Sequence, residues 1–272
     1  MGKENLVEVA KNTVNIQNKG YYDINGSTIF IQDDVKQCIK NTVIYIDDNI
    51  RIPENVENKR AKIEFTNETT IAAALRLKNE KGSACALNFA SAKHPGGGFL
   101  KGSMAQEESI AYISSLYISL SKFDNEFYKY HLNNLTPFYS DRIIYSKDVL
   151  VFKDEKYNLL ENPYKINIIT SPAVNAGIVM EKMPDKKKEI YPAMEKRIRK
   201  IIQVAVANSD KNLVLGAFGC GVFKNDLSDV ARIFKQILLK ENYQKYFNTI
   251  TFAIFDRSGM EVVNTFRAKF SY

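Results

Sequence analysis

The sequence is poor in the residues that build metal centres and disulfide frameworks. Its 272 residues include two histidines and three cysteines, and Cys38, Cys85 and Cys220 lie far apart without a CxxC pair. Closely spaced Cys and His ligands, as a zinc site needs, are therefore missing. We expect no metal and no other cofactor. The odd cysteine count favours a reducing cytosol over a disulfide-linked secreted protein.

Long apolar stretches are also missing. No run approaches the roughly 18 apolar residues needed to cross a bilayer, and the first residues, Met1 to Asn5, are charged. Leu6 occupies the position where a myristoylation motif needs Ser or Thr. We therefore expect no secretory signal, no membrane partner and a cytoplasmic location. The sequence shows no internal repeat or low-complexity segment.

The composition is that of an ordinary globular protein with a modest positive charge. Hydrophobic residues make up 45% and charged residues 25%, and the formal net charge is +7. This charge favours polyanionic partners such as nucleic acid or nucleotides, although it serves solubility equally well. The densest basic run, Lys186 to Lys188, is more typical of a solvated loop or helix start than of a binding site.

Hydrophobic periodicity indicates that the chain has two structural parts, an N-terminal appendage and a main domain. Residues 1–60 contain a helix over about 4–17, a hairpin around Asn25-Gly26 and a short helix over 33–40. We expect this part to form an N-terminal appendage packed on a main domain of residues 61–272. In the main domain strand and helix patterns alternate, which predicts an α/β fold with three layers, α/β/α.

The expected elements of the main domain follow from apolar runs and helical stripes. Strands are expected over 84–89, 142–145, 149–152, 165–170, 213–218 and 249–255, and helices over 106–121, 187–208 and 227–240. Glycine-rich loops follow the strands at 84–89 and 213–218. Because ligands of such sheets bind beyond the carboxyl ends of the strands, both loops can line one crevice.

The first glycine loop is the strongest functional signal. Gly96, Gly97 and Gly98 follow His94-Pro95, and Gln106, Glu107 and Glu108 come soon after at the start of a helix. Glycines let the backbone approach a ligand, and consecutive amides can cradle a phosphate. Taken alone, the loop can also be a surface turn, and two acidic residues often stand in a first helical turn because they suit the macrodipole. A phosphate cradle beside two carboxylates indicates an enzyme that acts on a phosphorylated sugar.

The second loop runs from Gly216 to Asp226 between a strand and a helix. Its amides can meet a diphosphate at the helix N-terminus, or it can be an ordinary connection with Cys220 in its core. Asn88 ends a strand just before the first loop, where an Asn can also simply form a turn. Phe255 ends the last expected strand, and most strand phenylalanines are core residues.

The triple glycine followed by Gln-Glu-Glu resembles the signature of the microbial poly(ADP-ribose) glycohydrolases. The similarity extends to Leu87–Ala92, Ser114–Tyr117, the segment Asp141–Ser146 and the segment Ser171–Asn175. The resemblance implies a macrodomain fold with a mixed sheet. Tyr112 is a departure, because relatives often carry Arg at that place in the helix.

The resemblance also implies roles for the candidate residues. Glu108 would protonate the leaving oxygen of the ribose–ribose bond and then activate water, so that no metal is needed, while Glu107 and Gln106 would hold ribose hydroxyls. Since the helix dipole lowers a carboxylate's pKa, a catalytic glutamate there needs desolvation by substrate to act as an acid. The further substrate-binding residues implied are Asn88, Gly96, Gly97, Gly98, Gly219, Gly221, Val222, Phe223 and Phe255, with Phe255 stacking on adenine.

Three functions stay open at this stage. The leading one is hydrolysis of poly(ADP-ribose) with ADP-ribose as the product. The second is hydrolysis of ADP-ribose from a mono-ADP-ribosylated protein or nucleic acid, since the ADP-ribose half of the site would be the same. The third is a non-catalytic ADP-ribose reader, although readers usually lack the carboxylate pair. We expect a monomer that recognises the polymer or another ADP-ribosylated macromolecule.

Overall fold

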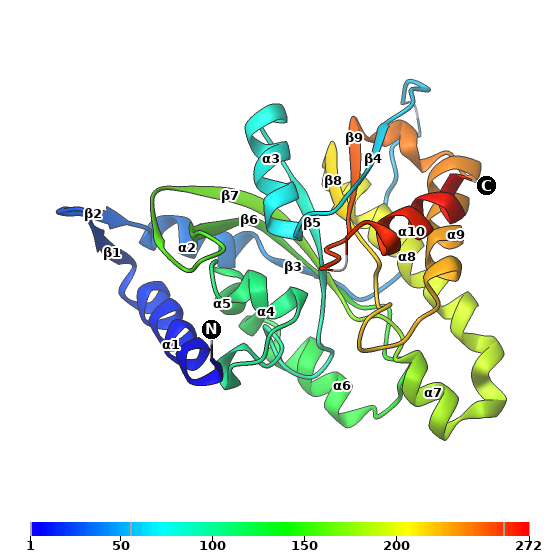
Figure 1. The fold of residues 1–272 in the computed structure, drawn as a ribbon, viewed down its shortest axis with the longest axis horizontal. Helices are drawn as coiled ribbons and strands as arrows, with labels where there is room; N and C mark the ends of the chain where they lie inside the picture. The colour runs from blue at the N-terminus through cyan, green and yellow to red at the C-terminus, as the bar shows by residue number, and fades with distance from the viewer. Residues whose placement is uncertain (1, 55, 258, 272) are drawn as a thin grey trace.

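The computed structural model is built around a seven-stranded mixed sheet with the strand order β3-β6-β7-β5-β8-β9-β4 (Figure 1). The structure describes residues 2–54, 56–257 and 259–271. The neighbouring pairs β7-β5, β5-β8, β8-β9 and β9-β4 are parallel. The pairs β3-β6 and β6-β7 are antiparallel. The seven strands are β3 (Val43–Tyr45), β4 (Lys62–Thr66), β5 (Cys85–Phe89), β6 (Ile143–Lys153), β7 (Leu159–Ser171), β8 (Asn212–Leu215) and β9 (Thr249–Ala253).

Helices cover both faces of this sheet. The α-helices are α1 (Lys3–Lys19), α2 (Gln32–Asn41), α3 (Thr70–Lys81), α4 (Gln106–Ala111), α5 (Leu116–Ser121), α6 (Tyr130–Asn133), α7 (Ala176–Lys182), α8 (Ile190–Ala207), α9 (Leu227–Lys235) and α10 (Glu261–Ser271). None of those described is long and apolar enough to span a membrane.

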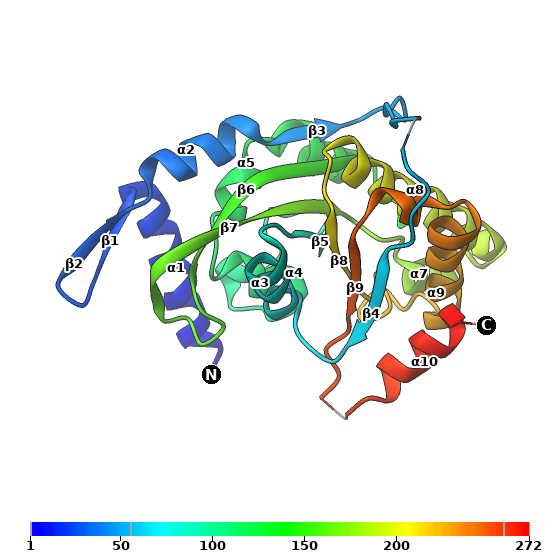
Figure 2. The same cartoon turned by 90° about the horizontal axis from the view of Figure 1, so that it is seen from above.

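Strand alternation divides the interior of the main sheet into two large cores, one on each face. Cys85 and Leu87 of β5 pack in the core beneath α8, α9 and α10, whereas Ala86 packs in the core beneath α1, α3, α4 and α5. Figure 2 shows α3 and α8 on opposite sides of the twisted sheet. The structure thus confirms the expected three-layer α/β/α fold with a mixed sheet.

The N-terminal residues pack on the outer part of this sheet. The hairpin of β1 (Tyr21–Ile24) and β2 (Ser27–Phe30) extends from the body beside α1 and α2 (Figure 2). Ile16 and Tyr22 share a small core with Leu150 and Phe152 of β6. Strand β3 precedes residue 60 but joins the main sheet as an edge strand. The expected boundary at residue 60 between an N-terminal appendage and the main domain stays a prediction.

The expectation of one helix over 106–121 was wrong. The helix is interrupted between α4 and α5, where Ser114 forms a β-bridge with Val151 of β6. The amide of Ser115 donates to the carbonyl of Leu150 at 2.8 Å, and the amide of Leu150 donates to Ser115 Oγ at 2.9 Å. The apolar stripe fits a helix, but these tertiary hydrogen bonds replace the helical ones.

Other element boundaries also differ from the expectations. The two short strands around 142–152 form one strand, β6, with two register shifts against β7, and Asp148, with φ +58°, lies in the first of them. The expected helix over 187–208 starts as a 3-10 turn, Pro184–Glu189, before α8. Strand β4 and helices α3, α6, α7 and α10 were not foreseen.

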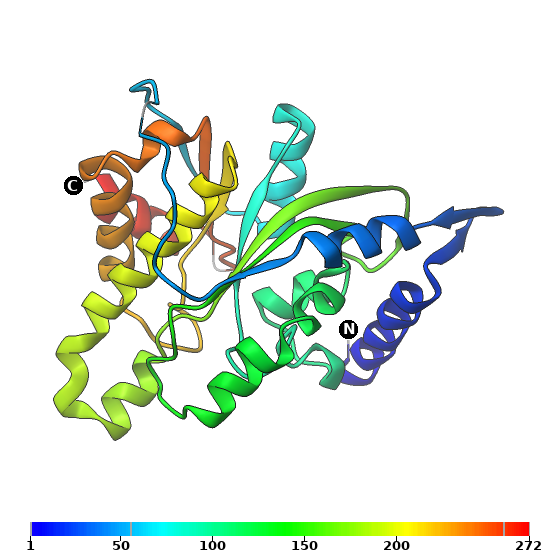
Figure 3. The same ribbon diagram turned by 180° about the vertical axis from the view of Figure 1, so that it is seen from behind.

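The parallel part of the sheet positions the site. The loops after β5, β7, β8 and β9 all leave the same edge because these strands share one direction. In Figures 1 and 3 the loops after β5 and β8 emerge beside α6 and α7. Segments that are far apart in the sequence therefore meet at this edge.

Candidate active site

The first glycine loop folds around two carboxylates. Gly96 and Gly97 adopt φ values of +67° and +64°, which L side chains rarely take. A Cβ atom built on Gly97 would lie 2.3 Å from Glu108 Oε1 and 3.1 Å from Glu107 Oε2. On Gly98 a Cβ would lie 2.4 Å from Ser103 Oγ. Glycine is therefore required at Gly96 and Gly97 by the backbone conformation, and at Gly97 and Gly98 because neighbouring side chains leave no room for a Cβ atom.

Glu108 stands in the first turn of α4 and faces this loop. Its Oε1 atom accepts a hydrogen bond from the amide of Gly98 at 2.7 Å, and the residue is 8% exposed. Among the described residues, no hydrogen bond reaches Oε2. One oxygen is thus fixed by the loop, while the other is available for a ligand.

Glu107 lies deeper, under the same loop. Oε1 accepts from Asn88 Nδ2 at 3.1 Å and Oε2 from the amide of Ser91 at 2.6 Å. Burial raises the pKa of Glu107 to about 8, with a further contribution from the neighbouring charge of Glu108, although its hydrogen bonds oppose the rise. Glu107 therefore holds a proton up to a higher pH than an exposed glutamate does.

Asn88 and Gln106 connect the site to the end of β5. Asn88 is fully buried, and Nδ2 also approaches Thr170 Oγ1 at 3.2 Å, while Oδ1 has no partner among the described residues. Gln106 Oε1 accepts from the amide of Phe89 at 2.8 Å, and Nε2 donates to the carbonyl of Leu87 at 2.8 Å. In this structure the Gln106 carboxamide is therefore engaged by the protein itself.

The second loop, residues 216–226, joins β8 to α9. Gly219 has φ +73°, and a Cβ there would lie 2.5 Å from Ala173 Cβ. Asn225, which the sequence did not single out, donates from Nδ2 to the carbonyls of Val174 at 2.8 Å and Gly219 at 3.0 Å. Its place just before the helix cap Asp226 is the only sequence signal for this role.

The tip of the second loop is open. Val222 is 83% exposed, and a Cβ on Gly221 would meet no atom within 4 Å. Phe223 is half-buried, and its carbonyl accepts from the amide of Gly177 in α7 at 3.0 Å. The loop is therefore anchored at its base and at Phe223, with Val222 projecting from it.

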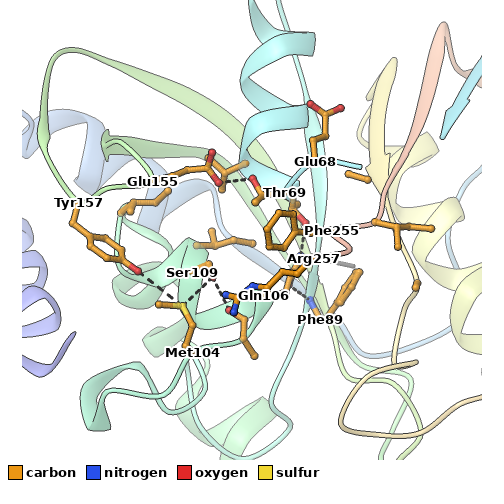
Figure 4. A pocket seen from close by; sticks show the side chains of 18 residues that line it. Glu68, Thr69, Phe89, Met104, Gln106, Ser109, Glu155, Tyr157, Phe255 and Arg257 are labelled. Atoms are coloured by element: carbon orange, nitrogen blue, oxygen red, sulfur yellow. Dashed lines mark hydrogen bonds between the residues drawn. The ribbon is translucent and has the colours of Figure 1, made fainter. Parts of the chain in front are cut away.

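A pocket of about 450 Å³ lies between α4, the start of α3 and the end of β9. Figure 4 shows Gln106, Phe89 and Phe255 around it, with Arg257 close to Phe255. Phe255 is 59% exposed, and the Arg257 guanidinium lies 6.0 Å from the centre of its ring. Glu155 and Tyr157 of the β6–β7 turn also line the pocket, and nothing in the sequence pattern pointed to them or to Arg257.

The structure thus brings most of the sequence candidates to one edge of the sheet. Glu107, Glu108 and Asn88 meet the first glycine loop, and Gln106 and Phe255 line the adjoining pocket. The contacts of Gly219 and Phe223 are with the end of β7 and with α7. Within the described residues, no group of three or more His, Cys, Asp or Glu side chains is arranged to hold a metal ion.

Comparisons with known proteins agree with this geometry. The microbial-type PARG catalytic domain family matches residues 10–154, just over half of the chain. The poly(ADP-ribose) glycohydrolase (PARG) of Thermomonospora curvata is 37% identical, with a TM-score of 0.91 over 98% of this chain and 99% of that one. The same enzyme bound to the inhibitor ADP-HPD is 36% identical, with a TM-score of 0.87 and the same coverage.

A second relative is more distant in structure. The Deinococcus radiodurans PARG in complex with ADP-ribose is 36% identical, with a TM-score of 0.78 over 91% of this chain and 98% of that one. The comparison with curated proteins gave no match. On the family match and the near-complete structural similarity, the chain belongs to the microbial-type PARG family, the poly(ADP-ribose) glycohydrolases, and is a glycosidase.

Proposed function

We propose that Glu108 is the acid and base with which this glycosidase cleaves the ribose–ribose bond of poly(ADP-ribose). The observation that supports this most directly is the position of Glu108 against the glycine loop. Its Oε1 accepts from the Gly98 amide, and the loop leaves no room for a side chain at Gly97. A carboxylate held this rigidly can be placed against a reacting oxygen.

The reaction then needs only one side chain for both proton transfers. In the substrate complex, where desolvation by the bound substrate favours the neutral carboxyl, Glu108 donates its proton to the leaving ribose oxygen as the glycosidic bond breaks, and an oxocarbenium-like ribose forms. The resulting carboxylate takes a proton from water, and the hydroxide adds to the ribose C1″. Glu108 ends protonated, as it began, and free ADP-ribose is released.

Glu107 holds the ribose hydroxyls. With its pKa near 8 it is largely protonated at neutral pH, and a protonated carboxyl both donates and accepts hydrogen bonds. Asn88 donates a hydrogen bond to Glu107, and its Oδ1, which has no partner within the described part of the chain, can accept a hydrogen bond from a ribose hydroxyl. Gln106 contacts a ribose when substrate displaces one of its present partners, the amide of Phe89 or the carbonyl of Leu87.

The remaining residues bind the ADP part of the substrate. Amides of Gly219 and Gly221 face the diphosphate, Val222 and Phe223 close over it, and Phe223 sets the distal ribose. Phe255 stacks on adenine in the 450 Å³ pocket, and the exposure of its ring supports this. Gly96, Gly97 and Gly98 border the ribose beside the glutamates. The ADP-ribose bound in the Deinococcus radiodurans relative supports this class of ligand.

We further propose that the protein works as a monomer in the cytoplasm. All three cysteines are free thiols, which supports a reducing compartment. The net charge of +7 suits a polyanionic substrate. Gel filtration with light scattering tests the monomer, because a mass near twice 31.0 kDa contradicts it.

The experiment that tests the mechanism is ADP-ribose release from automodified poly(ADP-ribose) by wild type and Glu108→Gln. We expect release to fall by at least about 10³-fold, because acid and base catalysis are both lost. Binding of free ADP-ribose, measured by calorimetry, should persist. Asp33→Asn is the matched control, since Asp33 also lies in the first turn of a helix, α2, but is exposed and packs against neither loop.

The outcomes are distinct. Full release by Glu108→Gln contradicts the role of Glu108. Absence of release by wild type, together with ADP-ribose cleavage from a mono-ADP-ribosylated protein or nucleic acid, changes the substrate and keeps the chemistry. Tight ADP-ribose binding with no turnover of any substrate would make the protein a reader.

A further inference from the structure

Tyr139 adopts an unusual backbone conformation outside the residues discussed so far. Its φ is +55°, in the left-handed region that bulky residues rarely occupy. Such a conformation persists only where the surrounding structure imposes it, and it is frequent near functional sites. Contacts around the segment between α6 and β6 must therefore impose this conformation on Tyr139.

The ring of Tyr139 packs on Phe223 of the second glycine loop. The ring centroids lie 6.0 Å apart with an interplanar angle of 39°. On another side Tyr139 meets the edge of buried His131 at 5.9 Å and 89°. Burial raises the pKa of the Tyr139 hydroxyl, while the nearby Asn175 side chain opposes the rise. Tyr139 thus stands between the protein interior and Phe223.

Buried groups hold the chain on both sides of Tyr139. Arg197, which is 2% exposed, donates to the carbonyl of Phe138 at 3.0 Å and to Asp141 Oδ1 at 2.7 Å. His131 Nε2 accepts from the amide of Ser140 at 3.1 Å. Desolvation lowers the pKa of His131 to about 4, so the ring is neutral and can accept this bond at neutral pH.

A second connection runs from the same segment to Phe223. The carbonyl of Pro137 accepts from the amide of Asn175 at 2.8 Å, and Asn175 caps α7. The next glycine of α7, Gly177, donates to the carbonyl of Phe223 at 3.0 Å. The backbone of Phe223 is therefore fixed by α7, and its ring rests against Tyr139.

We propose that Tyr139 is a positioning residue that sets the ring of Phe223 against the distal ribose. This rests on the proposed function, in which Phe223 orients that ribose beside Glu108. Tyr139 acts through Phe223 and does not contact the reacting atoms. Without the ring of Tyr139, the ring of Phe223 loses a packing contact and becomes free to move. The ribose that packs on Phe223 then samples orientations in which Glu108 cannot reach the glycosidic oxygen. Turnover falls while affinity for ADP-ribose, set by the diphosphate and adenine contacts, is kept.

Tyr139→Gly separates this role from a structural one. Glycine adopts φ +55° freely, so relief of strain offsets part of the lost packing, and thermal unfolding establishes that the variant is folded at the assay temperature. We expect kcat on automodified poly(ADP-ribose) to fall at least 10-fold, with KM and the Kd of ADP-ribose within 3-fold of wild type. Tyr139→Phe keeps the ring and should restore kcat to within 3-fold. Ser209→Gly is the matched control, because it relieves φ +61° at an exposed site on another loop.

Two results overturn the proposal. Wild-type kcat in Tyr139→Gly shows that Phe223 needs no support from this ring. Equal losses in kcat and in ADP-ribose affinity show that Tyr139 holds the whole loop or binds the ligand itself. Failure of the proposed function is distinguishable, since it shows as full activity of Glu108→Gln, whatever the Tyr139 variants do.

Discussion

Gly97 and Glu108 are in such close contact that the carboxylate occupies the space where a side chain of residue 97 would stand. A Cβ built on Gly97 would lie 2.3 Å from Glu108 Oε1, well inside contact distance. The same backbone turn gives Gly97 a φ of +64° and aims the next amide, that of Gly98, at Oε1. The glycine loop and the glutamate thus form one unit.

Gly97→Ala should therefore damage catalysis far more than stability. We expect the methyl group to displace Glu108 and to lower kcat at least about 100-fold, as a misplacement of about 1 Å does. The left-handed φ adds a stability cost of about 1–2 kcal/mol. Gly26→Ala is the control, because Gly26 has φ +77° with no atom near its Cβ position. It should show the stability cost alone, and equal activity losses in both variants would contradict the argument.

Burial of Glu107 predicts a pH dependence of stability. Its folded-state pKa is about 8 against an ordinary value of 4.5. Between these values the folded protein retains a proton that the unfolded chain releases. The free energy of unfolding therefore falls as pH rises from about 4.5 to 8, by up to about 1.4 kcal/mol per pH unit.

Urea unfolding of wild type and Glu107→Gln at pH 5.5 and 7.5 measures this contribution. Gln carries no titrating proton, so the variant should lose less stability than wild type between these two pH values. Parallel changes in the two proteins would show that Glu107 is ionised in the folded state.

The parts of the site that sequence predicts best are those fixed by local spacing. The triple glycine and the two glutamates, ten residues further on, indicate a loop and a first helical turn, and the structure brings them into contact. The strand before each glycine loop is also readable from apolar runs, because buried parallel strands are continuously apolar. Together these signals give the layers of the fold and the edge that carries the site.

The parts that sequence does not predict depend on long-range partners. The break at Ser114 and Ser115 is caused by hydrogen bonds to β6, which no local pattern contains. The Gln106 carboxamide bonds to the amide of Phe89 and the carbonyl of Leu87, and only the fold places these β5 groups beside it. Buried charges such as Arg197 have the sequence environment of a surface helix residue, and only the fold shows the carbonyls that they bind.

Tyr112 should matter to catalysis through the glycine loop. Its buried hydroxyl lies 3.0 Å from the carbonyl of Phe99 and 2.8 Å from that of Ser103, which closes the loop behind Gly98. Tyr112→Phe leaves these carbonyls without that donor, which costs about 1–3 kcal/mol. We expect a several-fold lower kcat in addition, because the Gly98 amide is held less firmly against Glu108.

Tyr22→Phe is the matched control for Tyr112→Phe. Tyr22 donates to the carbonyl of Leu160 at 2.6 Å and is also buried, but it lies in the N-terminal hairpin. Thermal unfolding should show a loss of stability in both variants. Polymer turnover, measured well below both unfolding temperatures, should fall only in Tyr112→Phe. Unchanged turnover in Tyr112→Phe would mean that the loop keeps its shape without the hydroxyl.

Phe255 should contribute to substrate binding and hardly to folding. Its ring is 59% exposed on the wall of the pocket, so replacement by Ala removes little buried surface and should change stability by less than about 0.5 kcal/mol. Stacking on a base is worth about 1–3 kcal/mol, or roughly 5- to 150-fold in affinity. We expect the Kd of ADP-ribose, measured by calorimetry, to rise within that range, with kcat at saturating polymer nearly unchanged. Phe30→Ala is the control, because Phe30 is 78% exposed on the β1–β2 hairpin. A rise in Kd that is equal in both variants, or absent from Phe255→Ala, would move the adenine site away from this ring.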